Sequence, residues 1–184
     1  MTVLASRAQL RASFFRWALF LVPVVLLLGF LSGAASGSAA ENPWFAALEK
    51  PALYPPSVTF PVVWSALYAL MGFAAALVAA AWGARGRAAA LVMFTIQFAL
   101  NLAWSPVFFG LHELHWALYL LGAIDLAVLM TLVLFWRVRW QAGILLLPYL
   151  AWVCFASLLT YDLIQLNPKS DGAEYSGAVQ RIEL

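Results

Sequence analysis

Two amide side chains lie within the apolar segment "QFALNLAWSPVFFG", which begins at Gln97. Intervals of four, three and four residues put a set of side chains on one face of a helix, namely Gln97, Asn101, Trp104 and Phe108. Amides in an apolar solvent need hydrogen-bond partners, which neighbouring helices usually supply. We therefore expect Gln97, the deeper of the two, to bond to another helix. For Asn101, nearer the end of the helix, a ligand contact and an interhelical bond are equally open.

Aromatic residues recur at helical spacing in other apolar stretches. Trp64 and Tyr68 form one ringed face, and Trp116 begins a later stretch. A third face is carried by Tyr149, Trp152, Ala156 and Leu159. Ligand pockets are mostly apolar and aromatic with a few placed polar groups, so these faces predict stacking on a large flat ligand. The alternative is that the rings pack in the core or face lipid.

Ionisable and metal-binding side chains are few. Asp125 lies in the middle of an apolar stretch, where such a residue is a functional candidate by default; a neutral carboxyl group or a bond to another helix are the alternatives. His112 and His115 lack the HExxH pattern and a third ligand, which favours a solvated pair over metal or haem ligation. Cys154 is the only cysteine, so internal disulfides and multi-cysteine metal sites are excluded.

The elements that position these residues follow from composition. The chain has 184 residues, of which 65% are apolar and 10% charged, against about 45–50% and about 25% in soluble domains. This indicates a membrane as solvent, and a net charge of +2 gives no support for nucleic-acid binding. Five stretches reach the roughly 20 residues that a spanning helix needs. The predicted spans are 17–40, 58–82, 88–109, 115–136 and 142–166.

The predicted fold is therefore an all-α membrane protein, a bundle of five transmembrane helices over residues 17–166. A basic N-terminal extension, residues 1–16, precedes it. A polar C-terminal tail, residues 167–184, follows and is expected to be disordered.

The one long connection, Glu41–Ser57, is rich in proline and aromatic residues. Proline fixes φ and has no backbone donor, so the loop is stiffened without hydrogen bonds. We expect a rigid lid over a cavity, although an interfacial aromatic belt is the alternative. The lid residues are Trp44, Lys50, Pro51, Tyr54, Pro55 and Pro56. Phe60, just beyond the lid, is expected to be a ligand-binding residue.

Basic residues predict the orientation in an inner or plasma membrane. One side would hold seven, at positions 7, 11, 16, 85, 87, 137 and 139, and the other side three, at 50, 169 and 181. Because excess Lys and Arg stay cytoplasmic, the N-terminus is expected inside and the C-terminus outside. A secretory signal peptide cleaved before Glu41 is the rival interpretation of the first span, but 24 uncharged residues exceed an ordinary signal core.

Several motifs together resemble the translocator protein family, also called the tryptophan-rich sensory protein or peripheral benzodiazepine receptor family (TspO/MBR). They are "PWFAALEKPALYPP", "FPVVWSALYALMGF", "QFALNLAWSPVFFG", "HWALYLL" and "PYLAWVCFASLLTYDLIQLN". The resemblance implies a five-helix bundle, commonly a homodimer, with the first loop folded over a pocket. It also implies binding of porphyrins, haem-like tetrapyrroles or other small apolar ligands, with no obligatory cofactor.

The resemblance assigns roles to individual residues. Trp64 and Trp152 match the tryptophans implicated in porphyrin binding and breakdown, and are the candidate catalytic residues if the protein is an enzyme. Other matched pocket positions are Asn101, Trp104, Trp116, Ala156 and Leu159. The chain departs from the family at Ala52 and Leu53, at Thr160, and in having no Lys or Arg within five residues after Tyr161, as a sterol motif requires.

We therefore expect an integral membrane protein that binds a porphyrin between Trp64 and Trp152, acting in ligand binding, transport or stress sensing. One alternative is a light-dependent porphyrin-degrading enzyme with tryptophan as electron donor. Another is a structural or regulatory partner protein. An ATP-driven pump is disfavoured because nucleotide motifs are missing from the sequence.

Overall fold

Five long helices form the protein in a computed structural model that describes residues 7–38 and 42–172. Within these residues, five helices are long and apolar enough to cross a membrane, as the sequence predicts. Their bounds are α1 Arg7–Ala35, α3 Thr59–Ala79, α4 Arg87–Ser105, α5 Leu114–Val138 and α6 Trp140–Leu166. A short helix, α2 Pro43–Ala47, lies in the long loop, and a π-helical turn, η1 Pro106–Gly110, extends α4.

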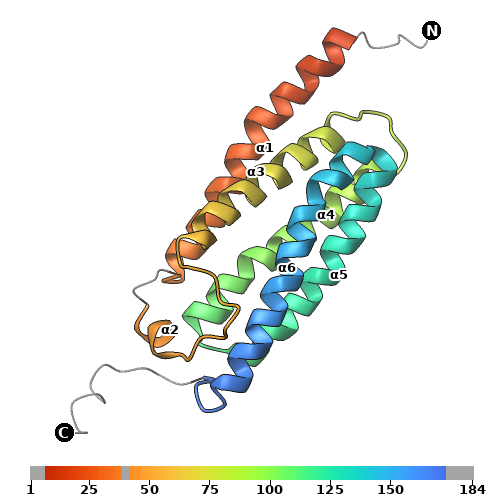
Figure 1. Cartoon of the computed structure of the whole chain (residues 1–184). Coiled ribbons are helices and arrows are strands. Elements are labelled where there is room, and N and C mark those ends of the chain that lie inside the picture. Colours follow the sequence, from red (N-terminus) through yellow and green to blue (C-terminus); the bar gives the residue numbers. More distant parts are fainter. Residues whose placement is uncertain (1–6, 39–41, 173–184) are drawn as a thin grey trace, which may run out of the picture.

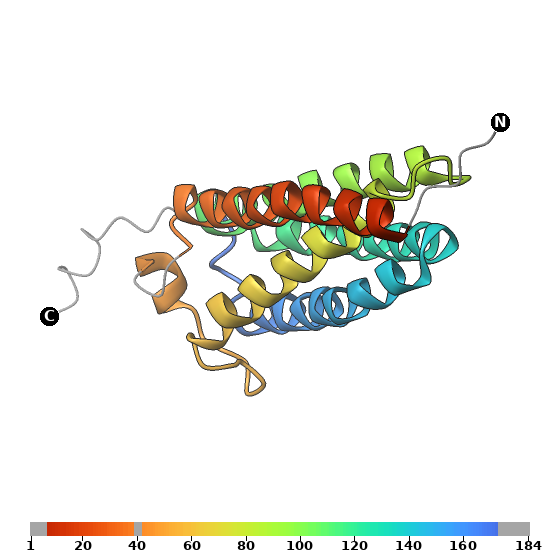
Figure 2. The same cartoon turned by 90° about the horizontal axis from the view of Figure 1, so that it is seen from above.

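The long helices pack as a closed ring in the order α1, α3, α6, α5, α4, with α3 also touching α4 and α5 across the interior. Figures 1 and 2 show the helices running along one common direction. The loop with α2, the α4–α5 corner and the end of α6 meet at one end of the bundle, here called the lid end (Figure 1). The α3–α4 and α5–α6 connections lie at the opposite end.

The helix bounds differ from the predicted spans chiefly in α1. This helix begins at Arg7 rather than Trp17 and ends at Ala35 rather than Ala40. Arginine and alanine favour helix, so the basic extension continues α1 beyond the other helices (Figure 1). The helix stops before Gly37, whose φ of 65° is left-handed and typical of a helix end. The rival cleavage position before Glu41 lies outside the described residues.

Small residues let the helices approach closely. A Cβ added at Gly72 of α3 would lie 2.7 Å from the Cα of Val22 in α1, so only glycine fits this crossing. Ala76 and Ala80, one and two turns later, are also buried. The small residues of the segment "GFAAALVAA" therefore pack within the chain.

Pro106 explains the π-helical turn at the end of α4. Its ring cannot donate a backbone hydrogen bond, and its own carbonyl accepts from Leu111 at 2.9 Å, five residues later. The wider turn releases the chain toward the corner before α5. It also presents Phe108 and Phe109 to the lid, where both rings contact Phe45.

The expectation of a disordered tail was wrong for residues 167–172. These residues fold back against the lid and the start of α5. The backbone N–H of Gly172 donates to the carbonyl of His112 at 3.0 Å, and the hydrogen bonds of Asn167, Ser170 and Asp171 are described below. We call residues 167–172 the clasp. The side chains of Asn167 and Asp171 bond to backbone groups of the lid and of α5, and the backbone carbonyl of Ser170 accepts from the Trp44 indole.

Candidate functional site

An aromatic seam joins α3 to α6 near the lid end. It consists of Phe60, Trp64, Tyr68, Tyr149 and Trp152. Phe60 lies one turn before Trp64 on α3, and Tyr149 one turn before Trp152 on α6, so each pair shares a helix face. The rings meet across the interface, with Phe60 to Trp152 at 5.9 Å and Trp64 to Tyr149 at 6.4 Å between centroids, both edge to face.

The burial of the seam residues decreases from the core to the surface. Tyr149 is completely buried and Tyr68 is buried, whereas the rings of Phe60, Trp64 and Trp152 are only half-buried. A flat ligand could therefore reach the outer three rings without unfolding the core. The sequence predicted all five as site residues, and the structure brings them together.

Glycine on α1 shapes the inner end of the seam. A Cβ at Gly29 would collide with the ring of Tyr68, so the ring lies flat against the α1 backbone. On its other side Tyr68 packs against Trp64 with centroids 5.1 Å apart. The position of Trp64 is thereby set from three helices, α1, α3 and α6. Sequence reasoning missed Gly29, because its requirement appears only when α1 and α3 are packed.

The structure shows which of the two buried amides bonds to another helix. The hydroxyl of Tyr68 donates to Oδ1 of Asn101 at 3.3 Å, so Asn101 makes the interhelical bond between α3 and α4. Both amide atoms of Gln97 are buried without a hydrogen-bond partner in the described part of the chain. The expectation that Gln97 bonds to another helix is thus wrong for these residues.

Two more buried donors face the interior near these amides. The Tyr149 hydroxyl interacts with the Asn101 side chain but makes no hydrogen bond of normal geometry among the described residues. The indole nitrogen of Trp104 is likewise unpaired there. Unpaired buried polar groups cost free energy.

Trp104 links the bundle to the lid. Its ring stacks on Phe108 at 4.8 Å with planes 21° apart. Phe108 in turn meets Trp44 and Phe45 of the lid at 5.5 and 5.9 Å. A continuous series of ring contacts thus runs from α4 to α2. Phe108, the last residue of the predicted helix face on α4, makes the contact with the lid.

The lid is ordered by its own short helix. Asn42 caps α2 by accepting from the backbone N–H of Phe45 at 3.0 Å, and Pro43 takes the first helical position, where a missing N–H costs nothing. Trp44 is only 2% exposed and stacks on His112 at 4.5 Å. Tyr54 continues the rings from Phe45 to Phe60 of the seam, at 5.9 and 5.3 Å.

Lys50 closes the end of α2. Its ammonium donates to the carbonyls of Phe45 and Leu48 and lies 4.5 Å from the Phe45 ring centroid. Burial lowers the pKa of Lys50 and raises the pKa of Tyr54, since each charged form loses hydration in the lid. Lys50 and Tyr54 are each followed directly by proline, at Pro51 and at Pro55 and Pro56.

The clasp fastens the lid to the bundle. The amide of Asn167 makes two hydrogen bonds with the backbone of Glu49, at 2.8 and 2.9 Å. The indole N–H of Trp44 donates to the carbonyl of Ser170 at 3.2 Å. Sequence reasoning missed Asn167 and Ser170 because no local pattern indicates a contact with a residue 118 or 126 positions away.

Asp171 caps α5 from a distant part of the chain. Its Oδ1 accepts from the backbone N–H groups of Leu114 and His115 at 2.5 and 3.3 Å, and its Oδ2 pairs with Nδ1 of His115 at 2.5 Å. The carboxylate therefore meets the positive end of the helix dipole. Among the described residues no three potential ligands gather as a metal site.

Trp116 is not part of the seam. It is 65% exposed and lies on the outer surface of α5 beside Tyr119. Leu159 is buried and Ala156 half-buried on α6, the latter packed against the core that holds the seam. The structure therefore gathers the predicted ligand residues of α3, α4 and α6 and leaves the one of α5 apart.

Asp125 makes a bond between α5 and α6. The hydroxyl of Ser157 donates to its Oδ2 at 2.9 Å, while its Oδ1 is buried without a partner among the described residues. Of the alternatives that the sequence left open, a hydrogen bond to another helix is the one found.

Comparison with known proteins gives this arrangement a family. The model of the TspO/MBR family matches residues 20–166, which include the lid, helices α3 to α6 and the part of α1 from residue 20 onward. The chain belongs to the TspO/MBR family.

Relatives agree with this assignment along most of the chain. Protein CrtK of Rhodobacter capsulatus is 38% identical over 74% of this chain and 86% of its own length. The tryptophan-rich protein TspO of Chlorobaculum tepidum is 37% identical over 80% and 93%. The human translocator protein is 40% identical over 64% and 71%. The resemblance predicted from the motifs is confirmed, as is an integral, multi-pass membrane protein of TspO/MBR type.

Proposed function

We propose that this TspO/MBR protein binds a tetrapyrrole of the porphyrin class at the aromatic seam. The observation that carries the proposal is the pairing of Trp64 on α3 with Trp152 on α6 through Tyr149 and Phe60. Two half-buried indoles on neighbouring helices offer broad faces to a planar macrocycle. A single tryptophan on one of the two helices would offer only one such face.

Polar groups beside the seam support a guest with nitrogen and oxygen atoms. Polar side-chain atoms of Gln97, Trp104 and Tyr149 are buried without a hydrogen-bond partner among the described residues. The seam consists of phenyl, indole and phenol rings, so the proposed contact is with the face of the macrocycle. A porphyrin carboxylate near the lid would compete with the carbonyls of Phe45 and Leu48 for Lys50.

The lid would control access. Because Tyr54 contacts Phe60 and Phe60 contacts Trp152, a macrocycle entering at the outer rings must displace or slide beneath Tyr54. We therefore propose that the lid retains the bound ligand. The remaining expectations, a homodimer with the N-terminus in the cytoplasm, belong to the same proposal.

Titration of the purified protein with protoporphyrin tests the binding. Saturable quenching of tryptophan fluorescence at one macrocycle per chain is expected, since a porphyrin at the seam lies close to two indoles. Absence of saturable quenching would refute the proposal. The same sample under illumination separates binding from breakdown, because only an enzyme would deplete the porphyrin absorbance faster than free porphyrin in micelles does.

A further inference from the structure

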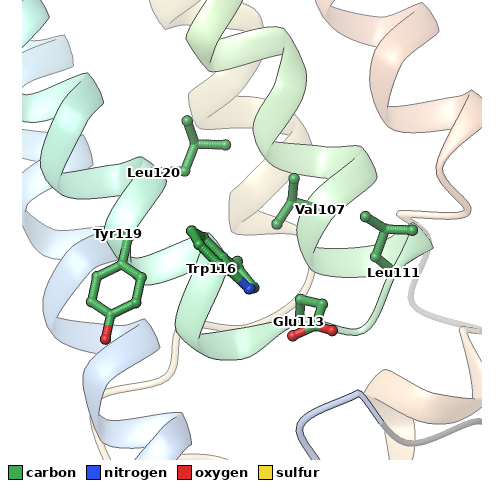
Figure 3. A pocket seen from close by; sticks show the side chains of 6 residues that line it. All are labelled: Val107, Leu111, Glu113, Trp116, Tyr119 and Leu120. Atoms are coloured by element: carbon green, nitrogen blue, oxygen red, sulfur yellow. The ribbon is translucent and has the colours of Figure 1, made fainter.

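A second apolar site lies on the outside of the bundle at the lid end. A groove of about 620 Å³ runs between η1 and the first turns of α5. Figure 3 shows Trp116 at its centre, with the side chains of the other residues around it. The lining residues are Val107, Leu111, Glu113, Trp116, Tyr119 and Leu120.

The groove is amphipathic along its length. Glu113 precedes the first residue of α5, Leu114, where the span ends and the headgroup layer begins. Leu120 lies almost two turns deeper, within the apolar part of the span. An occupant would therefore place a polar group beside Glu113 and an apolar chain along Trp116 and Leu120.

The polar end is suited to a cation. The only ion pair among the described residues joins His115 to Asp171, so the Glu113 carboxylate has no basic partner there. The rings of Trp116 and Tyr119 are each 65% exposed and lie 5.8 Å apart. A carboxylate beside exposed aromatic rings is a typical setting for an ammonium group.

An anionic headgroup is disfavoured at the same place. Helix N-termini attract anions through their free N–H groups, but here Asp171 already accepts from Leu114 and His115. The start of α5 is thus neutralised, and Glu113 adds a further negative charge. An occupant bearing only phosphate would face two carboxylates.

We propose that this groove binds phosphatidylethanolamine, with its ammonium on Glu113 and its acyl chain along Trp116 and Leu120. The primary ammonium can donate hydrogen bonds to the carboxylate, which a quaternary headgroup cannot. The site is separate from the seam and does not depend on tetrapyrrole binding.

Native mass spectrometry of the full chain tests the proposal by counting lipid adducts. The protein is released from nanodiscs that contain phosphatidylethanolamine together with either phosphatidylglycerol or phosphatidylcholine. Preferential retention of phosphatidylethanolamine is expected for the wild type. Glu113→Gln should reduce that preference by roughly two- to five-fold, as for an ion pair at a partly hydrated site.

Matched variants make the result specific. Trp116→Leu should weaken retention of both ammonium lipids about two- to five-fold through loss of the cation–π contact. Glu49→Gln, an exposed carboxylate at the same end, and Trp140→Leu, an exposed indole at the other end, should change nothing. Equal retention of all lipids, or equal effects of all four variants, would overturn the proposal. A change of subunit number in Trp116→Leu would also overturn it, in favour of a second copy as occupant.

Discussion

The side-chain amide of Asn167 pairs with the backbone of Glu49, accepting at 2.8 Å and donating at 2.9 Å. The end of α6 thereby holds the lid that stands over the seam. In this structure the lid is thus held by residues beyond the last membrane span.

Replacing Asn167 by alanine removes both bonds. Each bond is worth about 1 kcal/mol or less at an exposed position, so the bundle should stay folded while the lid opens more often. Hydrogen exchange of residues 42–57 should become faster by up to about ten-fold. Asn167→Asp keeps the acceptor alone and should give an intermediate rate, and unchanged exchange in both variants would contradict the clasp.

Replacing Asp171 by alanine removes the capping carboxylate from the start of α5 together with its ion pair to His115. A carboxylate at a helix N-terminus contributes about 0.5–2 kcal/mol, so the thermal midpoint should fall by a few degrees. Lys169→Gln, an exposed change in the same segment, is the control. Equal midpoints for the two variants would show that the cap does not stabilise α5.

Gln97 and Asn101 provide a matched pair of amides on one helix face. Gln97→Leu removes a 1% exposed amide that has no partner among the described residues, so unfolding of the ligand-free protein should be unchanged or harder by up to about 1 kcal/mol. Asn101→Leu leaves the Tyr68 hydroxyl unpaired and should cost about 1–3 kcal/mol. Chemical unfolding in one detergent compares them, and the opposite order would mean that Gln97 is the bridging residue.

Ser157→Ala breaks the bond between α5 and α6 at Asp125. Interhelical hydrogen bonds in membranes average about 0.6 kcal/mol, and a carboxyl group left with no partner adds to this loss. Ser65→Ala is the comparison, because its hydroxyl bonds only to Pro61 within its own helix. The free energy of unfolding should fall more for Ser157→Ala than for Ser65→Ala. Equal values would show that the hydrogen bond between Ser157 and Asp125 does not stabilise the packing of α5 against α6.

The sequence predicted the fold because its signals are local. Apolar length defined all five spans, and helical spacing put Trp64 with Tyr68 and Tyr149 with Trp152. Only the first span was substantially misplaced, since a helix can continue into water where hydropathy no longer marks it. Periodicity identifies a helix face without saying which neighbour that face meets.

The parts that sequence could not supply depend on contacts between distant segments. Asp171 capping α5 and Asn167 holding Glu49 join residues 57 and 118 positions apart, and polar tail residues look alike whether or not they are bound. Trp116 shares its residue type with the seam tryptophans, yet its place on α5 turns it outward. The sequence could not show which amide bonds to another helix for a related reason, because the position of Tyr68 on α3 decides which amide is within reach.

The dissociation constant of protoporphyrin for the Trp64→Phe/Trp152→Phe double variant tests the central claim most directly. Phenyl rings keep the fold but reduce the stacking surface, so binding should weaken by roughly ten-fold, a loss of about 1.4 kcal/mol. The Trp136→Phe/Trp140→Phe variant, at the opposite end of the bundle, should match the wild type. An unchanged constant for the seam variant, or an equal loss in both, would contradict binding at the seam.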